Sequence, residues 1–131
     1  MTDTTIVVPT YWGWPGGQPP HPGDAVFDHP TPVDGESTLP RLLNSLCRVV
    51  GAPFTVLVLT ATVNPALKQA AEQRVTRIIA PFRKRFPIAQ FAAGDLVVLH
   101  GRMRELRLGR PVSLFSLHSY PGVRNCQLVV P

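Results

Sequence analysis

The sequence predicts an α/β fold of three layers, in which a mostly parallel sheet is flanked by helices. Short apolar, β-branched runs alternate along the chain with helical stretches that carry one apolar face. One run, residues 54–60, is apolar almost throughout, which is typical of a strand covered on both faces of a parallel sheet. The 131 residues suffice for one domain with a hydrophobic core, and we find no internal repeat or second domain boundary.

The first expected strand is the run Ile6-Val7-Val8, which Pro9 is expected to stop. The stretch from Gly13 to Glu36 follows, with six prolines and five glycines among its 24 residues. This composition predicts a long loop without regular structure. A loop of this length inside a compact domain is usually functional or disordered.

A helix is expected over Leu39–Val50, because its leucines recur at the spacing of one buried helix face. Ser37 or Thr38 can cap its start, and Gly51 can end it. The strand Phe54–Thr60 comes next. A second helix is expected from Asn64 and its following proline to about residue 81.

The last third of the chain gives a less regular pattern. Ile88–Ala92 reads as a weaker strand, and Asp95 can cap a helix, although the run at 96–99 fits a strand as well. Residues 112–117 are expected to be extended, and a final helix is expected to open at Tyr120.

Charge is unevenly distributed along the chain. Residues 1–40 hold five acids and no Lys or Arg, whereas residues 41–131 hold all thirteen cations and three acids. Eleven cations are arginines, which suit phosphate binding, but they also fit solvated helix faces. A basic nucleic-acid-binding protein is a rival reading, although the cations lack interleaved aromatics and no nucleic-acid motif occurs, so no nucleic acid is expected as a partner.

Targeting and metal signals are weak in this sequence. No apolar run approaches the ~20 residues that span a bilayer, and the N-terminus lacks the pattern of a secretory signal. We therefore expect a cytoplasmic protein without a transmembrane segment, in which Cys47 and Cys126 are reduced. The four histidines lack metal-ligand spacing, and no serine stands in a nucleophile-elbow context.

Ligands of open α/β sheets bind outside the carboxyl ends of the strands, and the first such end carries Pro9, Thr10, Tyr11 and Trp12. Thr10 offers a hydroxyl, and the two aromatic rings could stack on a nucleobase or could simply cover the sheet edge. The glycine-rich phosphate loops of dinucleotide-binding and Walker sites are absent.

A second candidate segment runs from Tyr120 to Asn125. It places Arg124 and Asn125 in the first turns of the expected helix, where a guanidinium and a helix N-terminus favour a phosphate. An ordinary surface arginine and a helix-interior asparagine fit the same spacing.

Together these segments resemble the family-2-like glycosyltransferases of the GT-A fold. The stretch Ile6–Tyr11 is similar to their first-strand motif of hydrophobic residues followed by Pro-Thr-Tyr, and Gly122–Asn125 is similar to their later Gly/Ala-x-Arg-Asn motif. The helix Leu39–Val50 matches the helix that follows the first strand in that family. The similarity spans nearly the whole chain.

The resemblance implies a nucleotide-binding site made of Pro9, Thr10, Tyr11, Arg124 and Asn125, with no catalytic residue assigned. It implies transfer of a sugar from a nucleoside diphosphate sugar, with Mg²⁺ or Mn²⁺ neutralising the diphosphate.

Three departures from the family qualify this expectation. No acid follows the second strand, where residues 60–64 read TATVN, and the loop 13–36 is longer than usual. The metal-binding Asp-x-Asp motif is absent, so no metal ligands are expected in this chain. We therefore expect an incomplete catalytic domain, completed by a missing C-terminal segment or a second chain. The alternative is a non-catalytic α/β module that binds a nucleotide or another anion.

Overall fold

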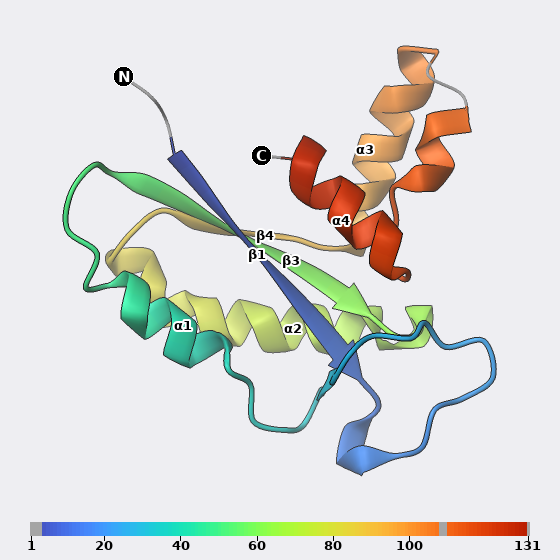
Figure 1. Ribbon diagram of the computed structural model, residues 1–131, viewed down its shortest axis with the longest axis horizontal. Helices are drawn as coiled ribbons and strands as arrows, with labels where there is room; N and C mark the ends of the chain where they lie inside the picture. The colour runs from blue at the N-terminus through green and yellow to red at the C-terminus, as the bar shows by residue number, and fades with distance from the viewer. Residues whose placement is uncertain (1–3, 108–109, 131) are drawn as a thin grey trace.

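Four parallel strands form one sheet in the order β2-β1-β3-β4. The computed structural model describes residues 4–107 and 110–130. The strands are β1 (Thr4–Gly13), β2 (Thr31–Pro32), β3 (Phe54–Thr62) and β4 (Ile88–Phe91). The helices are α1 (Leu39–Leu46), α2 (Lys68–Ile79), α3 (Ala93–Glu105) and α4 (Tyr120–Val129). Figure 1 shows α1 and α2 on one side of the sheet and α3 and α4 on the other, which confirms the predicted three-layer α/β fold.

Two hydrophobic cores lie on the two faces of this sheet, and the alternation of side chains along each strand divides residues between them. Even-numbered residues of β1 and β3, such as Val8 and Trp12, pack against α1 and α2. Odd-numbered residues, such as Leu59 and Ala61, pack against α3 and α4. The helices contribute their own inward stripes, which include Leu43, Val75, Ile79, Leu96, Val123 and Cys126.

The prediction that Pro9 stops the first strand is wrong, because β1 continues to Gly13. Peptide groups alternate between the two sides of a strand. The carbonyl of Trp12 accepts a hydrogen bond from Val63 on the β3 side, and that of Gly13 accepts one from Val33 on the β2 side. Pro9 shares the side of Gly13, where β2 pairs only with the last two residues of β1. The missing N–H therefore faces an open edge and costs no ladder hydrogen bond.

The prediction that the long loop 13–36 lacks regular structure is wrong. The loop contains the 3-10 turn η1 (Pro15–Gly17) and the short strand β2. Its interior is held by Asp24. That carboxylate accepts hydrogen bonds from Trp14 Nε1 (2.8 Å), from the backbone N–H of His21 (2.7 Å) and from Asn64 Nδ2 (2.9 Å). The loop is thereby anchored to the end of β3.

Helix α1 is shorter than predicted and ends at Leu46 rather than Val50. β-Branched Val49 and Val50 are poor helix formers, and both are exposed, so burial does not offset that preference. Gly51 adopts a φ of 136° in the loop that follows, instead of ending the helix. At the start of α1 the hydroxyl of Ser37 accepts a hydrogen bond from Leu39 N–H (3.1 Å).

The middle elements follow the prediction closely. β3 extends two residues beyond the expected Thr60. The side chain of Asn64 accepts a hydrogen bond from Ala66 N–H (2.9 Å), and the 3-10 turn η2 (Pro65–Leu67) leads into α2. After α2 the chain makes a further 3-10 turn, η3 (Ala80–Lys84), before β4. No helix in the described ranges is long and apolar enough to cross a bilayer.

Residues 96–99 are helical, since α3 begins at Ala93, and the alternative of a strand there is wrong. The carboxylate of Asp95 accepts a hydrogen bond from Ala92 N–H (2.9 Å). The extended segment predicted at 112–117 begins instead inside the 3-10 turn η4 (Arg110–Leu114). A strand there would need a neighbouring strand for its peptide groups, whereas Phe115 N–H bonds to the carbonyl of Val112 within the turn (3.2 Å). α4 begins at Tyr120, as predicted.

The packing of α4 predicts unequal reactivity of the two free cysteines. Burial raises the pKa of the Cys126 thiol to about 11, whereas Cys47 is only half-buried. A disulfide reagent at mildly alkaline pH should therefore modify Cys47 and leave Cys126 intact until the protein unfolds. Counting the thiols that the reagent modifies in the Cys47→Ser variant, with and without denaturant, checks this prediction. Rapid modification of Cys126 in the folded Cys47→Ser variant would contradict the packing of α4.

Candidate functional site

The carboxyl ends of β1 and β3 bring two distant segments together on the α4 side of the sheet. Tyr11 of β1 stacks on Tyr120, the first residue of α4, with ring centroids 5.6 Å apart and planes 6° from parallel. Phe27 from the long loop lies 4.8 Å from the Tyr11 ring. Arg124 lies over the ring of Tyr120, with its guanidinium carbon 5.8 Å from the ring centroid. Tyr11 and Arg124 therefore share one face of the sheet.

The first turn of α4 determines this arrangement. The hydroxyl of Ser119 accepts a hydrogen bond from Gly122 N–H (3.1 Å) and caps the helix. A Cβ on Gly122 would lie 2.7 Å from Ser116 Cβ, so only glycine lets this turn approach the preceding segment so closely. Tyr120 and Arg124 are four residues apart on the helix, which places their side chains on the same face.

Thr10 and Trp12 point to the opposite face of the sheet from Tyr11. The hydroxyl of Thr10 donates a hydrogen bond to the carbonyl of Leu59 (2.8 Å) and accepts one from Trp12 Nε1 (2.9 Å). Trp12 is 0% exposed and belongs to the core under α1 and α2. The sequence-based suggestion that its ring faces a ligand cleft is therefore wrong, because side chains alternate along the unbroken strand.

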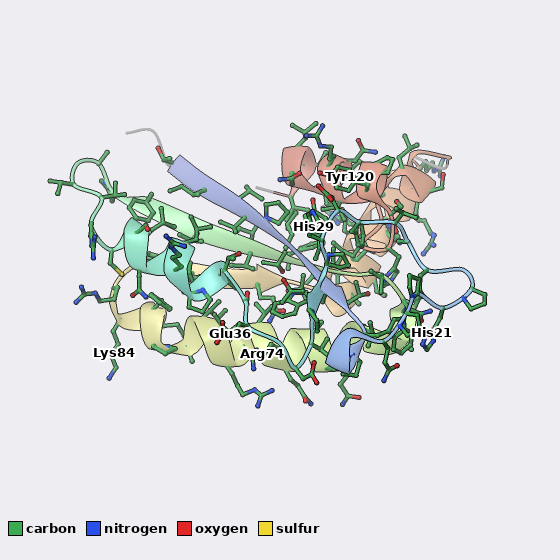
Figure 2. The ribbon with its side chains drawn as sticks, turned by 60° about the horizontal axis from the view of Figure 1, so that its bottom comes forward. His21, His29, Glu36, Arg74, Lys84 and Tyr120 are labelled. Atoms are coloured by element: carbon green, nitrogen blue, oxygen red, sulfur yellow. The ribbon has the colours of Figure 1, made fainter. Side chains whose placement is uncertain are left out.

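A hollow of about 190 Å³ lies along the open edge of β1, between the strand, the residues before β2 and the start of α1. Pro9, Thr10 and Tyr11 line one side of it, and His29 and Ser37 are among the residues of the other side. Tyr11 thus belongs both to this hollow and to the ring stack with Tyr120. Figure 2 labels His29, which precedes β2, and Tyr120 of α4.

Asn125 turns away from this group. Its side-chain amide donates a hydrogen bond to the carbonyl of Leu114 (2.8 Å) and ties α4 to η4. Of the five predicted site residues, Pro9, Thr10 and Tyr11 line one hollow. Arg124 lies over Tyr120, whose ring stacks on Tyr11. Asn125 does not line the hollow, and its amide bonds to the backbone of η4 instead.

The electrostatics of the ring stack favour an anion near Arg124. Within the described ranges this exposed guanidinium makes no salt bridge. Burial, followed by the neighbouring Tyr120, raises the pKa of Tyr11 above 10.0, and Arg124 acts in the opposite direction. Tyr11 is therefore a neutral hydrogen-bonding and stacking group at physiological pH.

Several residues at this edge were not assigned to the site from the sequence, although Tyr120 opens the second candidate segment. Tyr120 and Phe27 complete the aromatic group, and Asp24 supplies a carboxylate beside the end of β3, where the sequence itself has no acid. Partial burial raises the pKa of Asp24, but the hydrogen bonds from Asn64, His21 and Trp14 outweigh it and hold that pKa below 3.8. The signal for Tyr120 was its place at the start of the candidate segment Tyr120–Asn125. The contact of Asp24 with Asn64 spans 40 residues and has no local signal.

A further polar pair lies where β3 meets the segment before α4. His118 Nδ1 lies 3.0 Å from Thr62 Oγ1. Burial lowers the pKa of His118, against a hydrogen-bonding contact with the Thr62 backbone. This histidine is therefore neutral at physiological pH, and its ring becomes protonated only at a lower pH than that of an ordinary histidine.

The donor set of the described residues does not fit a divalent metal. No group of three His, Cys, Asp or Glu side chains there could hold an ion. The best-placed carboxylate, that of Asp24, already accepts three hydrogen bonds. No chemical step at this site is therefore assigned to Mg²⁺ or Mn²⁺.

Comparison of the chain with models of known protein families, with curated proteins and with solved structures finds no match.

The ring stack predicts an alkaline transition. Because the pKa of Tyr11 is raised in the folded chain, the associated stability is present below about pH 10 and is lost as pH rises through the folded pKa. Tyr120→Phe should lower that pKa, and Arg124→Gln should raise it. Near-ultraviolet absorbance of the phenolate, from a chain with only two tyrosines, measures both shifts. Shifts in the same direction would refute the arrangement.

A second prediction concerns the loop anchor. Asp24→Ala removes the acceptor of three hydrogen bonds, so backbone amides of residues 14–30 should exchange with deuterium faster than in the parent chain. Asp28→Ala is the matched control, because among the described residues this exposed carboxylate forms an ion pair only with exposed His29. Equal exchange in the two variants would show that Asp24 does not hold the loop.

Proposed function

We propose that the chain is the nucleotide-sugar-binding part of a cytoplasmic glycosyltransferase that transfers a sugar from a nucleoside diphosphate sugar. The observation that carries the proposal is the group of Tyr11, Tyr120 and Arg124 at the carboxyl ends of parallel strands. It combines flat rings for a base with a guanidinium that makes no salt bridge to another described residue, at the place where α/β sheets bind ligands.

The size of the adjoining hollow suggests how a nucleotide would divide between the two parts of the site. Sites for whole small ligands enclose about 300–1,000 Å³, whereas the hollow beside Tyr11 measures about 190 Å³. We therefore assign the base and part of its ribose to this hollow. The diphosphate would then lie outside, towards Arg124, where a charge-assisted bidentate hydrogen bond is available.

The candidate site supports binding more directly than catalysis. Its polar groups are a guanidinium, hydroxyls and an imidazole at the rim, and none is assigned as a nucleophile or general base. We propose that a further C-terminal segment or a second chain completes the acceptor side and supplies any metal ligands. A nucleotide-binding module without turnover uses the same residues and is the alternative function.

Ligand titration tests the proposal. Stability is measured by thermal unfolding with uridine, UDP, GDP and UDP-glucose, with and without Mn²⁺. A ligand that binds only the folded chain raises the midpoint in proportion to the logarithm of its concentration. Arg124→Gln should weaken a nucleoside diphosphate about tenfold or more and uridine far less, because only the diphosphate contacts the guanidinium.

Arg104→Gln is the matched control, since it removes one exposed arginine from α3 and leaves the site intact. No stabilisation by any nucleotide would refute the proposal, and so would equal losses in the two variants. Release of sugar from UDP-glucose assigns catalysis to this chain. Binding without release assigns the alternative function.

A further inference from the structure

The loop between α1 and β3 exposes aliphatic side chains at its tip. Val50 is 96% exposed and Val49 is 52% exposed, and the residues that follow, up to Pro53, are exposed as well. Gly51, with a φ of 136°, turns the chain there. Exposing two adjacent valines to water costs free energy in proportion to their unburied apolar area. No contact inside the described chain buries that area.

Exposed cations lie beside this tip and on the neighbouring segment that precedes β4. Arg48 precedes the valines, and Arg83, Lys84 and Arg85 come from η3 and the residue after it. Arg85 lines one hollow together with Arg48 and a second hollow together with Val49, so the two segments are contiguous in space. None of the four cations makes a salt bridge to another residue that the structure describes.

The chain segments that carry these cations contain no acid. The sequence has no acid between Glu36 and Glu72 and none between Glu72 and Asp95. The positive charge of these two segments is therefore not offset by acids of their own, and it attracts an anionic surface over about a Debye length.

We propose that this part of the molecule docks on an anionic lipid bilayer, with the two valines entering the headgroup region and the cations contacting lipid phosphates. We call it the docking pole and define it as Arg48, Val49, Val50, Arg83, Lys84 and Arg85. Cations beside a small aliphatic tip are what peripheral attachment to an anionic membrane requires.

Other partners fit the same surface less well. Nucleic-acid sites combine cations with aromatic rings on which bases stack. Here the most exposed apolar residues are aliphatic, and the nearby rings of Phe54 and Phe82 pack against buried Phe86. A stable protein interface buries about 800 Å² on each partner and has an apolar centre. Two valines among four cations are too small to form such a centre.

The docking pole lies at the amino ends of the strands, because its segments directly precede β3 and β4. The candidate nucleotide site lies at the carboxyl ends. Figure 2 shows Lys84 at one end of the molecule and His21 of the long loop at the other. Attachment through the docking pole would therefore leave the nucleotide site facing water. The inference does not depend on what that site binds.

Co-sedimentation with vesicles tests the docking. The chain should bind vesicles that contain phosphatidylserine and should not bind vesicles of phosphatidylcholine alone. Raising the salt from about 0.1 M to about 0.5 M should release it, since screening shortens the range of the attraction. Arg83→Gln, Lys84→Gln and Arg85→Gln together should lower partitioning on the order of 100-fold, from roughly fivefold for each cation.

Val49→Ser with Val50→Ser should lower partitioning roughly tenfold or more, because the apolar area that enters the headgroup region is lost. The matched control for charge is Arg102→Gln, Arg104→Gln and Arg107→Gln on and after α3. The matched apolar control is Val97→Ser with Val98→Ser, two α3 residues that are 70% and 71% exposed. Both controls should bind vesicles as the parent chain does, and circular dichroism confirms that all variants fold.

Three outcomes would overturn the proposal. Equal losses in the control and docking-pole variants would show a diffuse charge effect. An unchanged partition of the double-serine variant would reduce the surface to a site for any polyanion. Tighter retention of the parent chain by duplex DNA than by phosphatidylserine vesicles at the same salt would assign the surface to nucleic acid.

Discussion

Both the fold and the candidate site depend on the parallel pairing of β1 with β3. This ladder matches nine residue pairs, from Thr4 opposite Phe54 to Trp12 opposite Thr62, whereas β3 and β4 match four. Because side chains alternate, this register sends Trp12 into the core under α1 and α2, and Tyr11 to the face of α4. A shift by one residue would exchange the two rings and remove both the core packing and the stack with Tyr120.

Much of the fold was predictable because its signals are local. The caps at Asn64 and before Tyr120, and the apolar run of β3, each act within a few residues. The continuation of β1 past Pro9 was not predictable in that way, because the cost of a missing N–H depends on whether a neighbouring strand faces it. Once β1 continues, the alternation of side chains along the strand places Trp12 in the same core as Val8. The wrong expectation for Trp12 therefore came from ending the strand too early.

The candidate site was predictable only in part, because its contacts join distant segments. The sequence identified Tyr11 and Arg124, but not that Tyr120 lies between them, since this depends on how α4 crosses the sheet. It also identified the absence of an acid after β3. The structure brings Asp24 to that position from the long loop, where its lone pairs are used to hold the loop closed. A carboxylate occupied in this way stabilises the rim of the site and is a poor ligand for a cation.

The uneven charge of the sequence becomes a separation in space. Four of the five acids of the first 40 residues, among them Asp28 beside His29, belong to the loop 13–36, whose Phe27 lies beside Tyr120. Lys84 and Arg85 lie at the other end of the molecule. An extended polyanion approaching the candidate site would meet the acidic loop, whereas a single diphosphate could reach Arg124 alone. The same charges leave the docking pole open to a broad anionic surface. The two proposed sites would therefore differ in the size of the anion they admit as well as in their location, and this difference follows from the order of charges along the chain.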